Sequence, residues 1–141
     1  MNKKIFFLIP ILCLIFALLY FLIPARTKIY VAKPGEIISL PISVEKSEAH
    51  VVLLTFNYNE EIFEFMSNEC WIPNADYSKD RMLMYDTTKP IPRGQIGTII
   101  LKIKDTAPEG IYSVPFSCEG FNSNDKWTPI KVHIPQVTIT R

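Results

Sequence analysis

The feature that most constrains this chain is an uninterrupted apolar run near its N-terminus. Residues 5–23 read IFFLIPILCLIFALLYFLI, without one charged or strongly polar side chain. As a helix these residues would extend about 28 Å, close to the roughly 30 Å hydrocarbon core of a bilayer. The run therefore predicts one N-terminal transmembrane helix, and the rest of the chain is expected to fold as a separate domain.

Two interpretations of this run compete. A cleaved signal peptide has an apolar core of about 7 to 15 residues followed by small residues, whereas this run is longer and Ile23 stands where a small residue is expected. We therefore favour an uncleaved signal anchor. Lys3 and Lys4 favour a cytoplasmic N-terminus. The expected organisation is a signal anchor at 1–26 and one domain at 27–141, held by a single membrane pass on the periplasmic or extracellular side.

The charge of the expected domain argues against nucleic acid as a partner. All 14 acidic residues of the chain lie beyond residue 26, together with 12 of the 15 basic ones, so residues 27–141 carry a net charge of −2. Nucleic acid attracts a concentrated basic face. No nucleic-acid binding is therefore expected.

Alternating apolar and polar residues recur along the expected domain. Ile38, Leu40, Ile42 and Val44 share one face of a predicted strand, which follows a turn at Pro34-Gly35. Further strands are predicted within residues 51–58, 81–85, 98–104, 112–118 and 130–139, the last with a bulge or kink at Pro135. Short strands separated by turn residues are typical of a β-sandwich, so the expected fold class is all-β.

The expected domain contains two cysteines, Cys70 and Cys118. Their spacing is not that of a zinc site. In an oxidising compartment a disulfide between them is favoured, and two buried free thiols are the alternative.

The sequence offers no set of catalytic residues. His50 and His133 have no nucleophile in a suitable setting, and Glu60, Glu61 and Glu64 are more typical of solvent-exposed charges than of a catalytic carboxylate pair. The aspartates lack the spacing of a calcium-binding loop. We expect no catalytic residue, no metal site and no cofactor.

Two groups of residues are candidates for binding. The predicted strand at 51–58 is apolar on both sides, so its second side, with Val51, Leu53, Thr55 and Asn57, could contact a protein partner. Exposed aromatic rings such as Trp127 and Tyr85 could instead stack on sugars, although each could equally close one end of the core.

Five segments in the same order resemble the cohesin domain, the receptor module of cellulosome scaffolds. They are Ala32-Lys33-Pro34-Gly35-Glu36 followed by the alternating residues 38–44, Phe56-Asn57-Tyr58-Asn59-Glu60-Glu61-Ile62-Phe63-Glu64-Phe65, Gly97-Thr98-Ile99-Ile100-Leu101-Lys102-Ile103-Lys104, Ala107-Pro108-Glu109-Gly110, and Gly120-Phe121 with Asn124-Asp125. The resemblance implies a jelly-roll β-sandwich of about nine strands that binds a dockerin and has no catalytic activity. Polar residues that bond the dockerin in this family correspond here to Val51 and Leu53.

The first functional expectation is therefore a non-catalytic, membrane-tethered module that binds a dockerin-like protein or another envelope component. The first alternative is a carbohydrate-binding module linked to polysaccharide binding or breakdown, and the second is a structural accessory of a secretion or adhesion machine.

Overall fold

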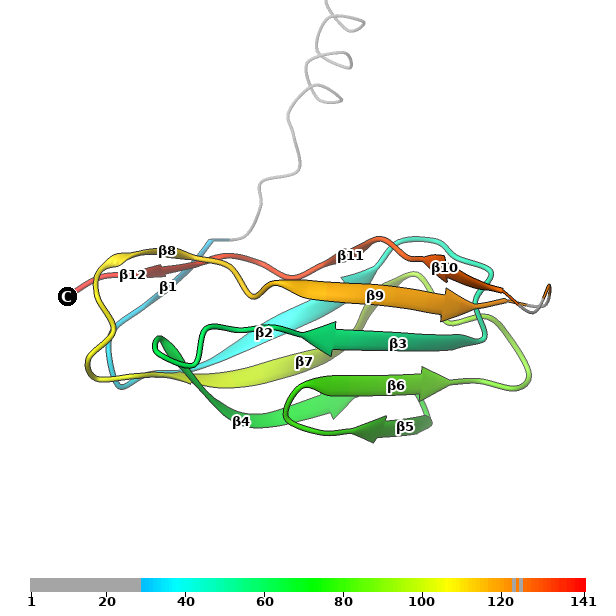
Figure 1. Ribbon diagram of the computed structural model, residues 1–141, viewed down its shortest axis with the longest axis horizontal. Helices are drawn as coiled ribbons and strands as arrows, with labels where there is room; N and C mark the ends of the chain where they lie inside the picture. The colour runs from blue at the N-terminus through cyan, green and yellow to red at the C-terminus, as the bar shows by residue number, and fades with distance from the viewer. Residues whose placement is uncertain (1–28, 123, 125) are drawn as a thin grey trace, which may run out of the picture.

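The computed structural model describes residues 29–122, 124 and 126–141 (Figure 1). All the regular secondary structure in these residues is β-strand, which confirms the expected all-β class. The strands of the described residues are β1 Tyr30–Ala32, β2 Ile37–Val44, β3 Val51–Phe56, β4 Phe63–Cys70, β5 Asn74–Tyr77, β6 Arg81–Tyr85, β7 Gly94–Ile103, β8 Gly110–Tyr112, β9 Phe116–Phe121, β10 Trp127–Pro129, β11 Val132–His133 and β12 Val137–Ile139. These twelve strands replace the nine or so that were expected.

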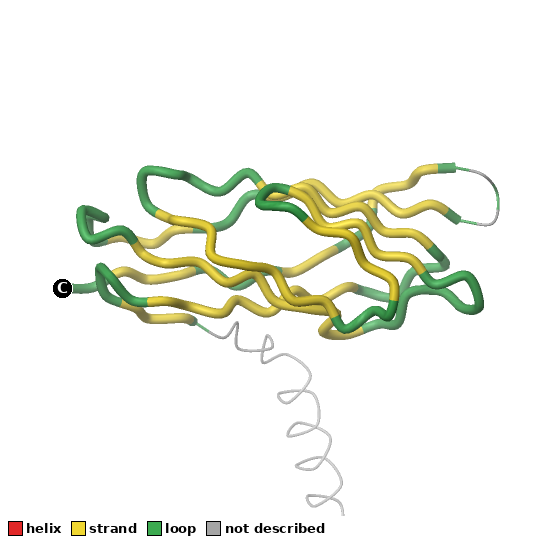
Figure 2. The backbone as a smooth tube through the Cα atoms, turned by 90° about the horizontal axis from the view of Figure 1, so that it is seen from below, coloured by secondary structure: helices red, strands yellow, loops and turns green. Residues whose placement is uncertain are grey.

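The strands form three hydrogen-bonded sheets with open edges. One has the order β10-β9-β3-β6-β5, the second β11-β2-β7-β4, and a small third sheet β1-β12-β8. The five-stranded sheet lies over the four-stranded one (Figures 1 and 2). The small sheet lies at one end, where the chain enters β1 (Figure 1). This arrangement is consistent with a β-sandwich.

Side chains that alternate along the strands build the core between the two larger sheets. On β2, Leu40, Ile42 and Val44 are buried, as the sequence pattern predicts. On β3, Val52 and Leu54 point inward and leave the second side of the strand partly exposed. The turn before β2 is also confirmed, since Gly35 has a φ of 85°, which a residue without a Cβ adopts readily.

Two segments expected as single strands are each divided between two sheets. The segment 112–118 contributes to β8, which pairs with β12, and to β9, which pairs with β3. The segment 130–139 contributes β11, which pairs with β2, and β12, which pairs with β1 and β8. Pro115 and Pro135 lie in the two gaps, and a proline cannot donate to a strand ladder. The expected break at Pro135 is thus confirmed, and it is larger than a bulge.

The expected disulfide is not present, because Cys70 and Cys118 are both free thiols. Cys70 lies on β4, an edge strand of the four-stranded sheet, and Cys118 lies on β9 of the facing sheet. β4 packs against the β5–β6 side of the five-stranded sheet, because the Nδ2 atom of Asn68 on β4 donates to the Ser78 carbonyl in the β5–β6 turn, 3.0 Å away. β9 is two strands away from β6. With strands about 4.8 Å and sheets about 10 Å apart, the cysteines are too distant for a bond that requires Cα atoms within roughly 7 Å.

The expected membrane anchor lies outside the described residues. Among residues 29–122, 124 and 126–141, no helix is long and apolar enough to cross a membrane.

Candidate functional site

The outer side of the five-stranded sheet brings the two groups of candidate binding residues together. In the strand register, Val51 on β3 is paired with Phe121 on β9 and with Tyr85 on β6, and Phe121 is paired with Trp127 on β10. Side chains of directly paired residues point to the same face of a sheet. No local pattern in the sequence places Trp127 and Tyr85 on the same face as Val51, whereas the strand pairing in the structure does so.

A second row of residues lies beside the first. Leu53 is paired with Leu83 on β6 and with Glu119 on β9, and Leu83 is paired with Asp76 on β5. Because Met82 and Met84 are buried, Leu83 between them points outward. We call the surface formed by Val51, Leu53, Leu83, Tyr85, Phe121 and Trp127 the β3 face.

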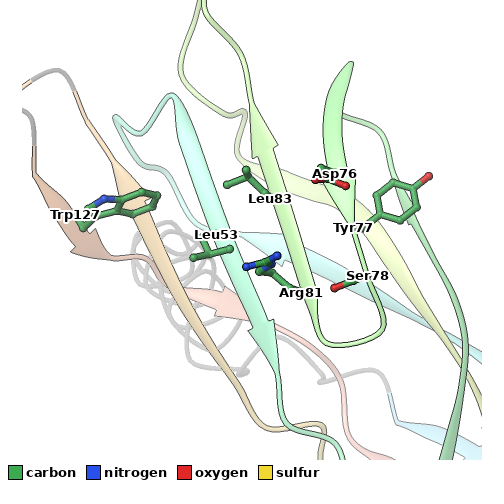
Figure 3. Close-up of a pocket in the computed structure, with 7 residues that line it drawn as sticks. All are labelled: Leu53, Asp76, Tyr77, Ser78, Arg81, Leu83 and Trp127. Atoms are coloured by element: carbon green, nitrogen blue, oxygen red, sulfur yellow. The ribbon is translucent and has the colours of Figure 1, made fainter.

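A hollow of about 260 Å³ lies on the β3 face. Leu53 and Leu83 project into it side by side from neighbouring strands, with Trp127 on the β10 side (Figure 3). Arg81 and Asp76 line the β6 and β5 side of the same hollow. The apolar centre thus has charged groups of both signs at its border.

The other two predicted residues of the candidate strand lie at its end. Thr55 is on the same side as Leu53 and is paired with Arg81. Asn57 is exposed but lies beyond β3, and its backbone N–H donates to the Pro115 carbonyl at 2.8 Å. Asn57 is therefore not part of the outward-facing rows of the sheet.

Leu83 and Phe121 were not among the candidate binding residues predicted from the sequence, although they lie on the β3 face. Both carry a local signal, because each is out of phase with buried neighbours on its own strand: Leu83 with Met82 and Met84, and Phe121 with Cys118 and Gly120. What the sequence could not supply is the pairing with β3, which joins segments far apart in the chain.

The exposed aromatic rings do not form a flat platform. Trp127 is 48% exposed and Tyr85 is 40% exposed. The rings of Trp127 and Phe121 are in contact, with centroids 5.4 Å apart, but their planes are tilted by 52°. Val51 separates this pair from Tyr85. The geometry is better suited to an irregular apolar surface than to the face of a sugar ring.

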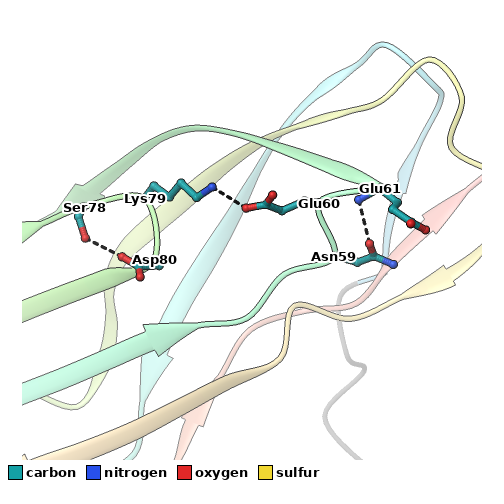
Figure 4. Close-up of polar contacts among 6 residues, drawn as sticks. All are labelled: Asn59, Glu60, Glu61, Ser78, Lys79 and Asp80. Atoms are coloured by element: carbon teal, nitrogen blue, oxygen red, sulfur yellow. Dashed lines mark hydrogen bonds and ion pairs between the residues drawn. The ribbon is translucent and has the colours of Figure 1, made fainter.

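The glutamates near the β3–β4 loop are not arranged as a catalytic pair (Figure 4). Glu60 forms an exposed ion pair with Lys79, from the β5–β6 turn. The hydrogen bond from Lys79 lowers the pKa of the Glu60 carboxyl, whereas a general acid needs a raised pKa. Nearby, the Ser78 hydroxyl donates to Asp80, and the Glu61 N–H donates to Asn59. These contacts connect loops and shape turns.

The histidines lie in separate parts of the fold. The Nδ1 atom of His50 lies 3.0 Å from the Asp86 carbonyl, whereas His133 is exposed on β11. In the part of the chain that the structure describes, no three His, Cys, Asp or Glu side chains are grouped so that they could hold a metal ion.

Comparison with solved structures assigns the fold. A cohesin from Clostridium acetobutylicum has a TM-score of 0.61 at 14% sequence identity, covering 79% of this chain and 86% of its own. The cohesin–dockerin complex from Clostridium thermocellum gives 0.60 at 16%, covering 79% and 94%. A non-cellulosomal cohesin from the archaeon Archaeoglobus fulgidus gives 0.57 at 12%, covering 80% and 89%. No protein-family model and no curated protein matches the sequence.

The described residues therefore have the fold of cohesin modules, a β-sandwich, as the resemblance in the sequence implied. At 12–16% identity these matches establish the fold alone.

Proposed function

We propose that this protein is a non-catalytic, cohesin-like binding module with a jelly-roll sandwich, and that its β3 face binds a protein partner. Residues 5–23 tether the module to the membrane with the N-terminus in the cytoplasm and the domain outside it. The length of the apolar run and Lys3 and Lys4 before it support this topology.

The observation that carries the proposal is the composition of the β3 face. Its centre, at Val51, Leu53 and Leu83, is apolar and only partly covered, and aromatic rings lie on both sides of it. Protein interfaces commonly combine an apolar, aromatic-rich centre with a polar border. Asp76, Arg81 and Glu119 supply that border. Single exposed apolar side chains are ordinary on a protein surface, whereas a contiguous apolar patch with a polar border is typical of an interaction site.

The apolar character of the β3 face also indicates which kind of partner would bind it. The solved structures with a similar fold include complexes of cohesins with dockerins. The resemblance in the sequence implies that this chain, too, binds a dockerin-like partner. Here Val51 and Leu53 stand where polar contacts are usual. The partner is therefore expected to offer an apolar ridge, such as one face of an amphipathic helix, and to belong to a dockerin-like protein or another envelope component.

Replacing Leu53 with Glu tests the proposal. A carboxylate at the centre of an apolar interface loses its water on binding and gains no partner, so the affinity should fall by about 2 kcal/mol or more, roughly 30-fold. The measurement is capture of the partner by the immobilised full chain in detergent, with the partner identified by mass spectrometry. The melting temperature should change by only a few degrees, because Leu53 is partly exposed.

The matched control is Met66→Glu. Met66 is 45% exposed at the bulge of β4 in the other large sheet, so the same charge is introduced at a distant surface. It should leave capture intact. Equal capture by the Leu53→Glu and wild-type chains, or equal loss in both variants, would contradict the proposal.

The two alternatives have less support. Carbohydrate binding would use the exposed Trp127, but the tilt between its ring and Phe121 gives no coplanar surface for a sugar. A purely structural accessory would leave the apolar centre of the β3 face without a role.

A further inference from the structure

The small sheet β1-β12-β8 has a second exposed apolar surface. In its register Val31, Thr138 and Ile111 form one row across the three strands. Val31 is 65% exposed, Ile111 is 69% exposed, and Ile29, two residues before Val31, is 70% exposed. We call the surface formed by Ile29, Val31, Thr138 and Ile111 the small-sheet face. Its residues are uncharged, so covering it desolvates no charge.

The residues on the opposite, inner side of the small sheet show that the exposed apolar residues are not needed to complete the core. Val137, Ile139 and Ala32 are fully buried on the inner side. Tyr30 and Tyr112, the register partners of Val137, are partly buried and pack against the same core. The core is therefore satisfied without Val31 and Ile111, and the outer residues remain available to another surface.

The position of this surface along the chain indicates what covers it. Only five residues, 24–28, separate Ile29 from the apolar run at 5–23. A fully extended chain spans at most about 3.6 Å per residue, so Ile29 lies within roughly 20 Å of the end of that run. If the run crosses the bilayer, the small sheet is the part of the described domain that is held nearest to the lipid headgroups.

We propose that the small-sheet face rests on the bilayer, with Ile29, Val31 and Ile111 reaching into the boundary between headgroups and acyl chains. This inference depends on the proposed membrane anchor. Apolar side chains enter that boundary readily, and the anchor keeps them at high effective concentration beside it. The contact would fix the orientation of the domain on the membrane.

A second copy of the chain is a poorer occupant of the same surface. A stable protein interface uses about 20 to 30 residues on each side. The small-sheet face offers strands of three residues each. A bilayer has no such size requirement, because the anchor already supplies the attachment.

Tryptophan fluorescence in vesicles tests the contact. The full chain is reconstituted into phosphatidylcholine vesicles with a Trp71→Phe and Trp127→Phe background, which removes both native tryptophans. Ile111→Trp then places a single probe on the small-sheet face, and Met66→Trp provides the control on β4, an edge strand of a different sheet (Figure 1). Lipids brominated near the headgroup should remove most of the emission of the Ile111→Trp chain and little from the Met66→Trp chain.

Three outcomes would overturn the inference, and they are distinguishable. If the chain does not float with the vesicles, the anchor itself is wrong and the inference falls with it. If the chain floats but bromination affects both probes equally and weakly, the tether stands and the lipid contact does not exist. If the Ile111→Trp emission is shifted to the blue without quenching and the chain sediments as a dimer, a second copy covers the face.

Discussion

Leu53 combines two roles that a single residue in a sheet can have. Its backbone is held between β6 and β9, through its register with Leu83 and Glu119, while its side chain remains partly exposed. A rigid backbone with a half-covered apolar side chain is well suited to a central contact of an interface, because little conformational entropy is lost on binding.

Cys118 is a second residue whose surroundings determine its chemistry. It is buried on the inner side of β9. Burial raises the pKa of its thiol most, and the negative charge of Glu119 raises it further, from 9.0 to about 12 in total. Burial also raises the pKa of Cys70. Both thiols therefore remain protonated near neutral pH, which makes them poor nucleophiles.

The raised pKa of Cys118 predicts a loss of stability at high pH. Above pH 9.0 the unfolded chain releases the thiol proton, whereas the folded chain retains it until about pH 12. The unfolded state then binds fewer protons, so the free energy of unfolding falls as pH rises through this window. Urea unfolding in detergent between about pH 8 and about pH 10.5 should show the decline.

Cys118→Ala serves as the control for this pH effect. Near neutral pH it should lower the stability because a small cavity forms, and this difference from the wild type should shrink as the pH rises above 9.0, because the variant has a shallower pH slope. Identical slopes for the two chains would show that Cys118 does not titrate as described.

Single residues also show what the sequence can and cannot predict. The alternation correctly assigned the inner side of β2 and the partly exposed side of β3, because burial follows a period of two. The cysteine pairing was wrong, since two inward-facing residues can still lie at opposite sides of a sandwich. Their lateral separation depends on strand order, which no local pattern contains.

At the scale of elements, β12 determines whether the small sheet exists. It is the central strand, pairing in parallel with β1 and antiparallel with β8. Val137 and Ile139 on it are fully buried. The sequence predicted the break before this strand at Pro135, but not that the chain changes sheets there, because alternation describes a strand and not its partners.

Removing residues 136–141 should therefore destabilise the whole domain. Burial of each of the Val137 and Ile139 side chains contributes about 1.5–3 kcal/mol, from a total stability of about 5–15 kcal/mol. β1 and β8 would also lose their pairing. A thermal melt followed by near-ultraviolet circular dichroism should show a much lower or absent cooperative transition.

Removal of Arg141 alone is the matched control for the truncation. Arg141 is exposed, and its backbone N–H donates to Glu109. The melting temperature should stay within a few degrees of the wild type. An unchanged melt after loss of residues 136–141 would mean that β12 is not integral to the fold.

At the scale of the whole molecule, two separate apolar surfaces have different proposed partners. The small sheet lies near the entry of the chain into β1 (Figure 1), and the residues of the β3 face lie on the outer side of the five-stranded sheet. A domain resting on the bilayer through the first would keep the second open to a protein in the envelope.

The most direct test of the central claim is site-specific photo-crosslinking through the β3 face. A benzoylphenylalanine replaces Leu83 in one full chain and Met66 in another, in cells that produce the protein. Irradiation of the Leu83 chain should give a discrete crosslinked product, identifiable by mass spectrometry, that disappears when Leu53→Glu is added. A product of equal yield from the Met66 chain, or a Leu83 product that survives Leu53→Glu, would contradict binding through this face.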